Sequence, residues 1–92
     1  MFHFPEIDPN GVHKNGEPWD LQHYEFHIYD ELAEYVVARH KDGLEEQAKE
    51  VVDVLHAAET LVRKFFRAHP DLVLEDFIKS TKIKNEIRGY YR

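Results

Sequence analysis

The chain has 92 residues, 42% of them hydrophobic, and 18 acidic residues against 12 Lys and Arg give it a formal net charge of −6. This length argues for one small domain, the apolar content argues against a disordered acidic tail, and the acidic balance disfavours nonspecific duplex DNA binding, which needs a basic face. The absence of cysteine excludes disulfides and thiolate metal sites, and the lack of a signal peptide or membrane-length apolar run predicts a cytoplasmic protein without a membrane partner.

Residues 1–18 are predicted to form an irregular N-terminal arm, followed by a helical domain over residues 19–92. The arm contains all but one of the four prolines and two of the four glycines, which is turn and loop chemistry. The aromatic residues Phe2, Phe4 and Trp19 leave two interpretations open. They either cap a small core, which is favoured, or stack on a nucleobase.

Three helices are predicted after the arm, and no strand pattern competes with them. Apolar residues recur at three- and four-residue steps from about residue 20, and Gly43 predicts the end of this first helix. A second helix is predicted over residues 44–68. It ends there because the residue before Pro70 avoids helical geometry. The third helix is predicted over residues 71–88.

The second helix carries a wider apolar surface than an ordinary surface helix. One stripe along it consists of Leu44, Ala48, Val51, Leu55, Ala58, Val62 and Phe65. This helix is therefore predicted to be central and to touch more than one neighbour. The expected fold is all-α: a helical hairpin plus a third helix, which completes a four-helix-type bundle by forming a homodimer or a tetramer.

Four acidic residues are predicted to face one another across the hairpin. Glu31 and Glu34 lie three residues apart and share a face of the first helix. Glu50 and Asp53 share a face of the second helix for the same reason. In an antiparallel hairpin that turns at Asp42, residues at equal height have a constant sum of residue numbers. This rule pairs Glu34 with Glu50, and it pairs Glu31 with Asp53.

The setting of these acids favours a metal site over a solvated surface. Glu31 is in register with the apolar residues of its helix, where a carboxylate is costly unless it is neutralised or coordinated. Acidic pairs at this spacing are also common on solvated helix faces, so both interpretations stay open. If a cation is bound, oxygen-only ligands favour magnesium or manganese.

The order of these motifs resembles that of the MazG-like, all-α nucleoside triphosphate pyrophosphohydrolases. That superfamily carries E-E-x-x-E on one helix and E-x-x-D on the next. Residues 30–34 (DELAE) correspond to the first motif, with Asp30 in place of its leading glutamate, and residues 50–53 (EVVD) match the second. Residues 53–56 (DVLH) resemble a stretch that is common after the aspartate of the second motif. Residues 84–91 (KNEIRGYY) are similar to the end of many short, phage- and prophage-type members. The resemblance covers about residues 20–91.

The resemblance implies hydrolysis of a nucleoside triphosphate to a monophosphate and pyrophosphate, as in nucleotide house-cleaning. It implies that magnesium, with manganese as an alternative, is held by Glu31, Glu34, Glu50 and Asp53. Asp30, or Glu34 through a second ion, would orient or deprotonate the attacking water. Lys82, Asn85 and Arg88, at steps of three along the third helix, could meet the phosphates or the base.

Two histidine patterns leave alternatives open. His23 and His27 are spaced as a zinc-binding pair, but a polar flank or a partner of the metal-binding acids is favoured. His56 follows Asp53 by three residues, so it either hydrogen-bonds a metal-bound carboxylate or simply packs against its neighbours.

Other functions are also consistent with the sequence. A non-catalytic acidic helical dimer that serves as a protein-interaction module is motivated by the wide second helix, the charge of −6 and the irregular residues 1–18, where the family usually has a helix. A phosphoribosyl-ATP pyrophosphohydrolase would share the same chemistry. The basic side chains near the C-terminus form either a solvated face or a phosphate clamp; they are Lys79, Lys82, Lys84, Arg88 and Arg92.

Overall fold

The computed structural model describes residues 4–7 and 20–91, and regular structure in these ranges is entirely helical. The helices are α1 (Leu21–Lys41), α2 (Leu44–Ala68) and α3 (Leu74–Ile87). The all-α class is confirmed, as are the bounds predicted for the first two helices. Of the predicted arm over residues 1–18, only residues 4–7 are described, and the rest lies outside the described residues, as do Phe2 and Trp19. No helix in the described ranges is long and apolar enough to cross a membrane.

The hairpin between α1 and α2 has a tight turn. Asp20 caps the start of α1, where its side chain accepts a hydrogen bond from the backbone N–H of His23 at 3.0 Å. α1 ends at an extended Asp42, whose backbone N–H donates to the carbonyl of Ala38 at 2.8 Å. Gly43 does not stop α1 through the left-handed conformation that glycine favours. Its φ is −71°, and it serves as the N-cap of α2.

The third helix begins three residues later than predicted. The backbone N–H of Leu72 donates to the carbonyl of His69 at 3.0 Å, so the chain around Pro70 forms a turn that includes Asp71. Val73 is extended, with φ −103° and ψ 115°, and is the N-cap of α3. The turn thus uses the residues that the sequence pattern assigned to the first helical turn.

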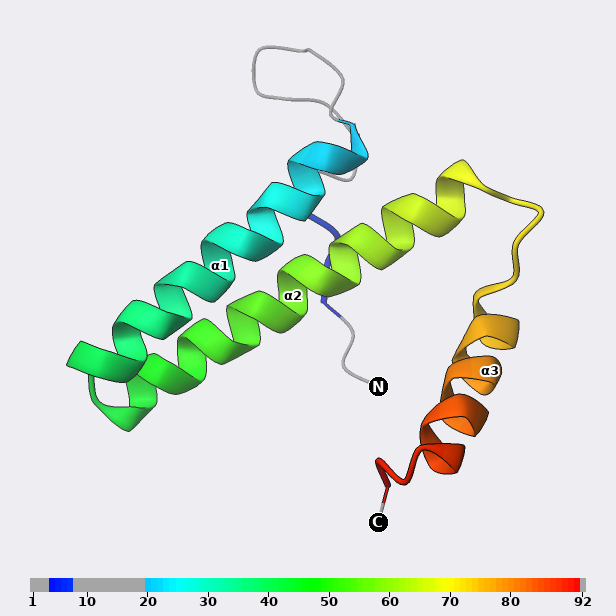
Figure 1. The fold of residues 1–92 in the computed structure, drawn as a ribbon. Helices are drawn as coiled ribbons and strands as arrows, with labels where there is room; N and C mark the ends of the chain where they lie inside the picture. Colours follow the sequence, from blue (N-terminus) through cyan, green and yellow to red (C-terminus); the bar gives the residue numbers. More distant parts are fainter. Residues whose placement is uncertain (1–3, 8–19, 92) are drawn as a thin grey trace.

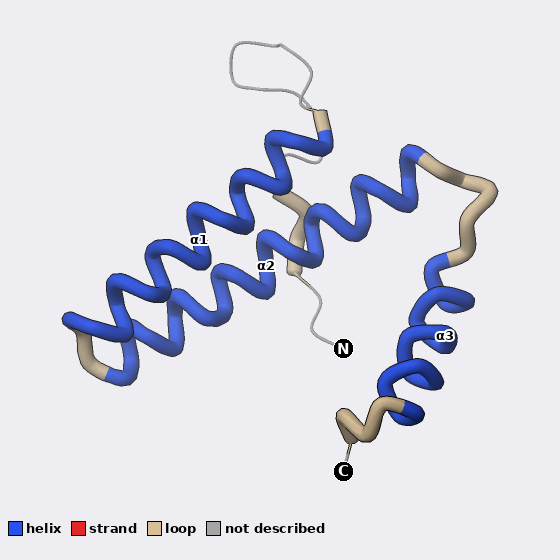
Figure 2. The backbone as a smooth tube through the Cα atoms, in the orientation of Figure 1, coloured by secondary structure: helices blue, strands red, loops and turns tan. Residues whose placement is uncertain are grey.

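The three helices form an open arrangement instead of a closed bundle. Figure 1 shows α1 and α2 as an antiparallel hairpin, with α3 beyond the C-terminal end of α2 and residues 4–7 crossing the hairpin. Figure 2 shows the same paths as a backbone tube. Phe66 of α2 contacts Phe77 of α3, and the centroids of the two rings are 5.9 Å apart. The radius of gyration is 15.7 Å, whereas a compact chain of this length would have about 12 Å.

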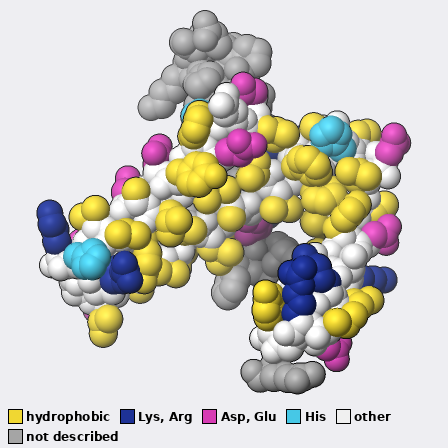
Figure 3. Space-filling model, in the orientation of Figure 1, with side chains coloured by type: hydrophobic (Ala, Val, Ile, Leu, Met, Phe, Trp, Pro, Cys, Tyr) yellow, Lys and Arg dark blue, Asp and Glu magenta, His cyan; other side chains and the backbone are white. Residues whose placement is uncertain are grey.

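The buried core is small for a chain of this size. The buried residues in the described ranges are Tyr24, Ala38, Ala57 and Thr60. The large side chains of the α2 stripe stay exposed, for example Val51 at 48% and Val62 at 39%. Figure 3 shows hydrophobic side chains gathered over both helices of the hairpin. One chain by itself therefore leaves much of its apolar surface in water.

Residues 4–7 dock on the C-terminal half of α2 through their backbone. The backbone carbonyl of Phe4 accepts a hydrogen bond from Arg63 Nη1 at 2.6 Å, and the backbone N–H of Phe4 donates to Glu59 Oε1 at 3.3 Å. The carbonyl of Pro5 lies 2.8 Å from His56 Nε2, and the Phe4 ring stacks on the His56 ring with centroids 4.8 Å apart. Of the two interpretations of His56, the structure supports packing. The Phe4 ring packs on His56 of the same chain.

An ion-pair cluster holds the same segment in place. The Glu6 carboxylate accepts hydrogen bonds from both Arg67 Nη atoms, at 2.9 and 2.7 Å, and lies 3.1 Å from Lys64 Nζ. The Arg67 hydrogen bond is the main reason that the pKa of Glu6 is lowered. The backbone N–H of Ile7 donates to Thr60 Oγ1 at 3.3 Å. α2 therefore contacts both α1 and residues 4–7, which confirms its predicted central place.

Candidate metal centre

Three carboxylates converge between α1 and α2. Glu31 of α1 and Glu50 and Asp53 of α2 each offer an oxygen atom, and these atoms all lie within 4.8 Å of one another. They meet because the hairpin turns at Asp42 and brings residues of equal height together, as the residue sums predict. The Glu31 side chain is 17% exposed, whereas Asp53 is exposed. The cluster thus has a buried side and a side open to solvent.

Two carboxylate oxygens of this cluster are buried without a donor. No hydrogen-bond donor in the described part of the chain reaches Oε2 of Glu31 or Oε2 of Glu50. An ionised carboxylate oxygen in that position is costly unless something compensates it. A hard divalent cation would do so, and a donor set made only of carboxylates suits magnesium or manganese. The residues present therefore fit a divalent cation.

The electrostatics point the same way. Burial is the largest cause that raises the pKa of Glu31; the charges of Glu34 and Asp53 add to it, and the His27 hydrogen bond opposes it. Burial also leads in raising the pKa of Glu50, followed by the charges of Glu34, Asp53 and Glu31 and a hydrogen bond with the Glu34 carboxyl. A positive ion among these groups would relieve the repulsion that their ionisation creates.

These raised pKa values predict how stability without metal depends on pH. The folded state holds protons on Glu31 and Glu50 that the unfolded state releases. The resulting stabilisation is fully present below the ordinary carboxyl pKa of 4.5 and is lost as the pH rises through the raised values. Glu6 acts in the opposite sense, since its pKa is lowered and its stabilisation is lost only as the pH falls below 4.5.

We therefore expect the melting temperature in EDTA to fall, because of this site, as the pH rises from 4.5 through the raised pKa values of Glu31 and Glu50. The Glu50→Gln variant should show a smaller fall, because one of the two groups no longer titrates. Thermal melts followed by circular dichroism would measure both. Identical pH profiles for the wild type and the variant would contradict the assignment of the effect to this cluster.

Glu34 lies next to the three-carboxylate cluster instead of within it. Its carboxyl shares a hydrogen bond with Glu50, and its charge acts on both Glu31 and Glu50. A cavity of about 370 Å³ opens beside it; it is lined by Ala33, Glu34, Val37, Ala38, Asp42 and Glu50. This cavity is therefore open space next to the acids.

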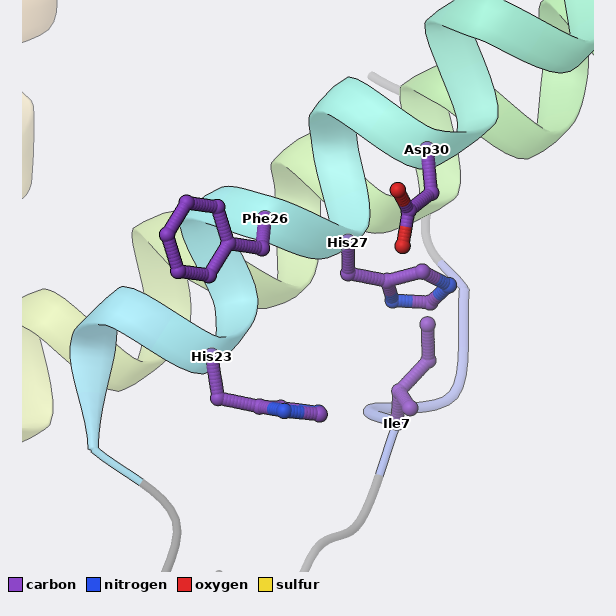
Figure 4. Close-up of a pocket in the computed structure, with 5 residues that line it drawn as sticks. All are labelled: Ile7, His23, Phe26, His27 and Asp30. Carbon is purple, nitrogen blue, oxygen red and sulfur yellow. The ribbon is translucent and has the colours of Figure 1, made fainter.

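Asp30 faces a different cavity, of about 310 Å³, on the His27 side of the cluster. This cavity is lined by Ile7, His23, Phe26, His27 and Asp30 (Figure 4). His27 separates the two regions, since its Nε2 lies 3.0 Å from Glu31 Oε1. This contact supports the interpretation of His27 as a partner of the acidic site. The metal-capable cluster found among the described residues contains no histidine, so the zinc alternative gains no support.

The predicted phosphate-binding residues are on the third helix and at its end. Lys82, Asn85 and Arg88 belong to α3 or its C-cap, and Lys82 lines a groove of about 280 Å³ together with Val62 of α2. Val62 is about 13 Å farther along α2 than Asp53 by helical rise. Lys82 therefore lies beside a part of α2 that is remote from the carboxylate cluster.

No family model, curated protein or solved structure matches this chain. The candidate site rests on its own geometry: converging carboxylates, two buried oxygens without donors, and an adjoining cavity on either side.

Proposed function

We propose that this chain is a metal-dependent nucleoside triphosphate pyrophosphohydrolase. The observation that carries the proposal is the convergence of Glu31, Glu50 and Asp53 within 4.8 Å, with buried oxygens of the two glutamates left without donors. The resemblance of the motif order to MazG-like enzymes supports the choice of reaction. The substrate would be a nucleoside triphosphate, and the products a monophosphate and pyrophosphate.

The proposed metal ligands are Glu31, Glu50 and Asp53, with Glu34 beside them. When bound, magnesium or manganese polarises phosphoryl oxygens, lowers the pKa of water and offsets the charge of the phosphates. Such an offset is needed because the chain carries a net charge of −6 and would otherwise repel a polyphosphate. His27 holds the Glu31 carboxylate in place through its hydrogen bond at 3.0 Å.

Glu34 is the better placed of the two candidate bases. Its carboxylate neighbours Glu50 and lines the open cavity beside the acids, whereas Asp30 faces the cavity beyond His27. In the proposed reaction, the oxygen of water bonds to one of the two phosphorus atoms joined by the α,β-bridging oxygen, and Glu34 accepts a proton of that water. The bond between the same phosphorus and the bridging oxygen breaks, and the products are the monophosphate and pyrophosphate.

The proposal is tested by incubating the purified chain with magnesium and a panel of canonical and modified nucleoside triphosphates. We expect equal amounts of pyrophosphate and monophosphate from at least one of them, and no reaction in EDTA. If a folded protein releases no pyrophosphate from any nucleotide of the panel, the proposal is wrong.

We also propose that the active assembly is a homodimer or a tetramer. The chain exposes 7322 Å² of surface, about 1,700 Å² more than the roughly 5,600 Å² expected for a compact monomer of 11.0 kDa. Obligate dimers bury about 1,000 Å² or more per chain, so the excess is large enough for such an interface. A second chain could also bring its α3, with Lys82, Asn85 and Arg88, to the carboxylates of the first.

The exposed apolar stripe of α2 also motivates a second candidate, a non-catalytic module that binds a partner protein. Stability linked to metal distinguishes the two functions. An ion that binds only the folded chain stabilises it by about 2.7 kcal/mol at a hundred times its dissociation constant, which raises the melting temperature by about 10 to 20 °C. If millimolar magnesium and manganese cause no shift, the interaction module becomes the better account.

A further inference from the structure

The cavity beside His27 adjoins the proposed reaction site. Its volume of about 310 Å³ is at the lower end of the range of about 300 to 1,000 Å³ that is typical of small-molecule pockets. It therefore has room for a ring system and not for a whole nucleotide. Figure 4 shows that His23 and His27 project from the same side of α1 toward Ile7, and that the Asp30 carboxylate lies beside the His27 ring.

The position of this cavity suits the base of a nucleotide whose phosphates lie at the carboxylates. His27 lines the cavity and is also within 3.0 Å of Glu31, so the two regions share this side chain. The Phe26 ring is 54% exposed at the rim and offers a flat apolar face. Stacking on such rings is a common way to hold a base, because every base has a π-face.

The cavity contains one group that can only accept hydrogen bonds. The rings of His23 and His27 can each donate or accept, whereas the Asp30 carboxylate only accepts. A ligand that donates a hydrogen bond to Asp30 is therefore favoured, and one that presents a carbonyl oxygen to Asp30 is disfavoured.

We propose that this cavity binds the nucleobase and selects bases that carry an exocyclic amino group, namely cytosine, adenine and guanine, over uracil and thymine. Uracil and thymine present a carbonyl oxygen where cytosine presents an amino group. Asp30 is then a residue that determines specificity and does not activate water. This inference rests on the proposed function, because it takes a nucleoside triphosphate as the substrate.

Matched pairs of substrates test the proposal most sharply. CTP and UTP differ at one amino group, as do GTP and ITP. We expect kcat/KM of the wild type to favour the amino-bearing member of each pair by about tenfold. In Asp30→Asn this preference should disappear, because an amide both donates and accepts. Glu25→Gln is the matched control on the exposed surface of α1 and should keep the preference.

Two kinetic outcomes would overturn the proposal while leaving hydrolysis in place. One is equal kcat/KM for both members of each pair in the wild type. The other is a uniform loss of kcat/KM for all nucleotides in Asp30→Asn, which would assign Asp30 to water activation.

Binding of the nucleosides cytidine and uridine without metal separates this proposal from the proposed function, because it needs neither turnover nor a phosphate beside the acids. NMR signals of the His23 and His27 rings should shift with cytidine at lower concentration than with uridine, and Asp30→Asn should remove the difference. That result would support the base pocket even if no pyrophosphate were released, in which case only the hydrolase proposal fails. No shift with either nucleoside at millimolar concentration would overturn the pocket.

Discussion

Replacing Glu50 by glutamine is expected to abolish magnesium-dependent pyrophosphate release and, at the same time, to raise the melting temperature of the metal-free protein. Changes to groups that merely support metal ligands cost about 10- to 100-fold, so the loss of a ligand should cost about a hundredfold or more. Stability should rise because the charges of Glu34, Asp53 and Glu31 no longer oppose an ionised group at this position. Steady-state kinetics and thermal melts in EDTA measure the two effects.

The matched control for this change is Glu46→Gln on the same helix. Glu46 is exposed and pairs with Lys49 at 2.9 Å, an interaction worth at most about 1 kcal/mol at the surface. The Glu46→Gln change should alter neither kcat nor the effect of magnesium on stability. A Glu50→Gln variant that keeps full activity, or that is less stable than the wild type without metal, would contradict the assignment of Glu50 to a metal site.

Replacing Leu55 by lysine is expected to convert the proposed dimer into monomers. Leu55 lies in the apolar stripe of α2 and is already 37% exposed in the single chain, so the fold itself should lose little stability. A charge buried without a partner in an interface should weaken association by more than about a hundredfold. Sedimentation equilibrium would measure the dissociation constant.

Val73→Lys provides the comparison for the interface. Val73 is 54% exposed and precedes α3, outside the α2 stripe, so this variant should stay associated. If the proposed pyrophosphohydrolase activity needs α3 of a second chain, the Leu55→Lys variant should also lose activity at concentrations where it is monomeric. A wild type that remains monomeric at all concentrations would contradict the proposed assembly.

The helices and the meeting of the acids could be predicted from the sequence because both follow from simple periodicities. Apolar spacing located α1 and α2, and a turn at Asp42 in an antiparallel hairpin determines which residues lie at equal height. That rule predicted that Glu31, Glu34, Glu50 and Asp53 converge, and the structure brings Glu31, Glu50 and Asp53 into one cluster. It could not tell that Glu34 lies beside the cluster, since equal height along the hairpin does not determine the direction of a side chain.

The rest depends on contacts that leave little trace in the sequence. Residues 4–7 dock largely through backbone atoms, which every residue type shares, so the side-chain pattern of the sequence did not predict this contact. His56 therefore turned toward Pro5 and not toward the acids. The position of α3 could not be predicted either. The turn around Pro70 determines the direction of α3, and the spacing of apolar residues does not encode that turn.

We propose that Glu31, Glu50 and Asp53 together bind a divalent cation. The most direct test is a crystal of the full chain soaked in manganese and measured at a wavelength where manganese scatters anomalously. The account predicts an anomalous peak within coordination distance of carboxylate oxygens from all three residues, and no peak there in Glu50→Gln. A well-ordered structure with no anomalous density between these carboxylates would contradict it.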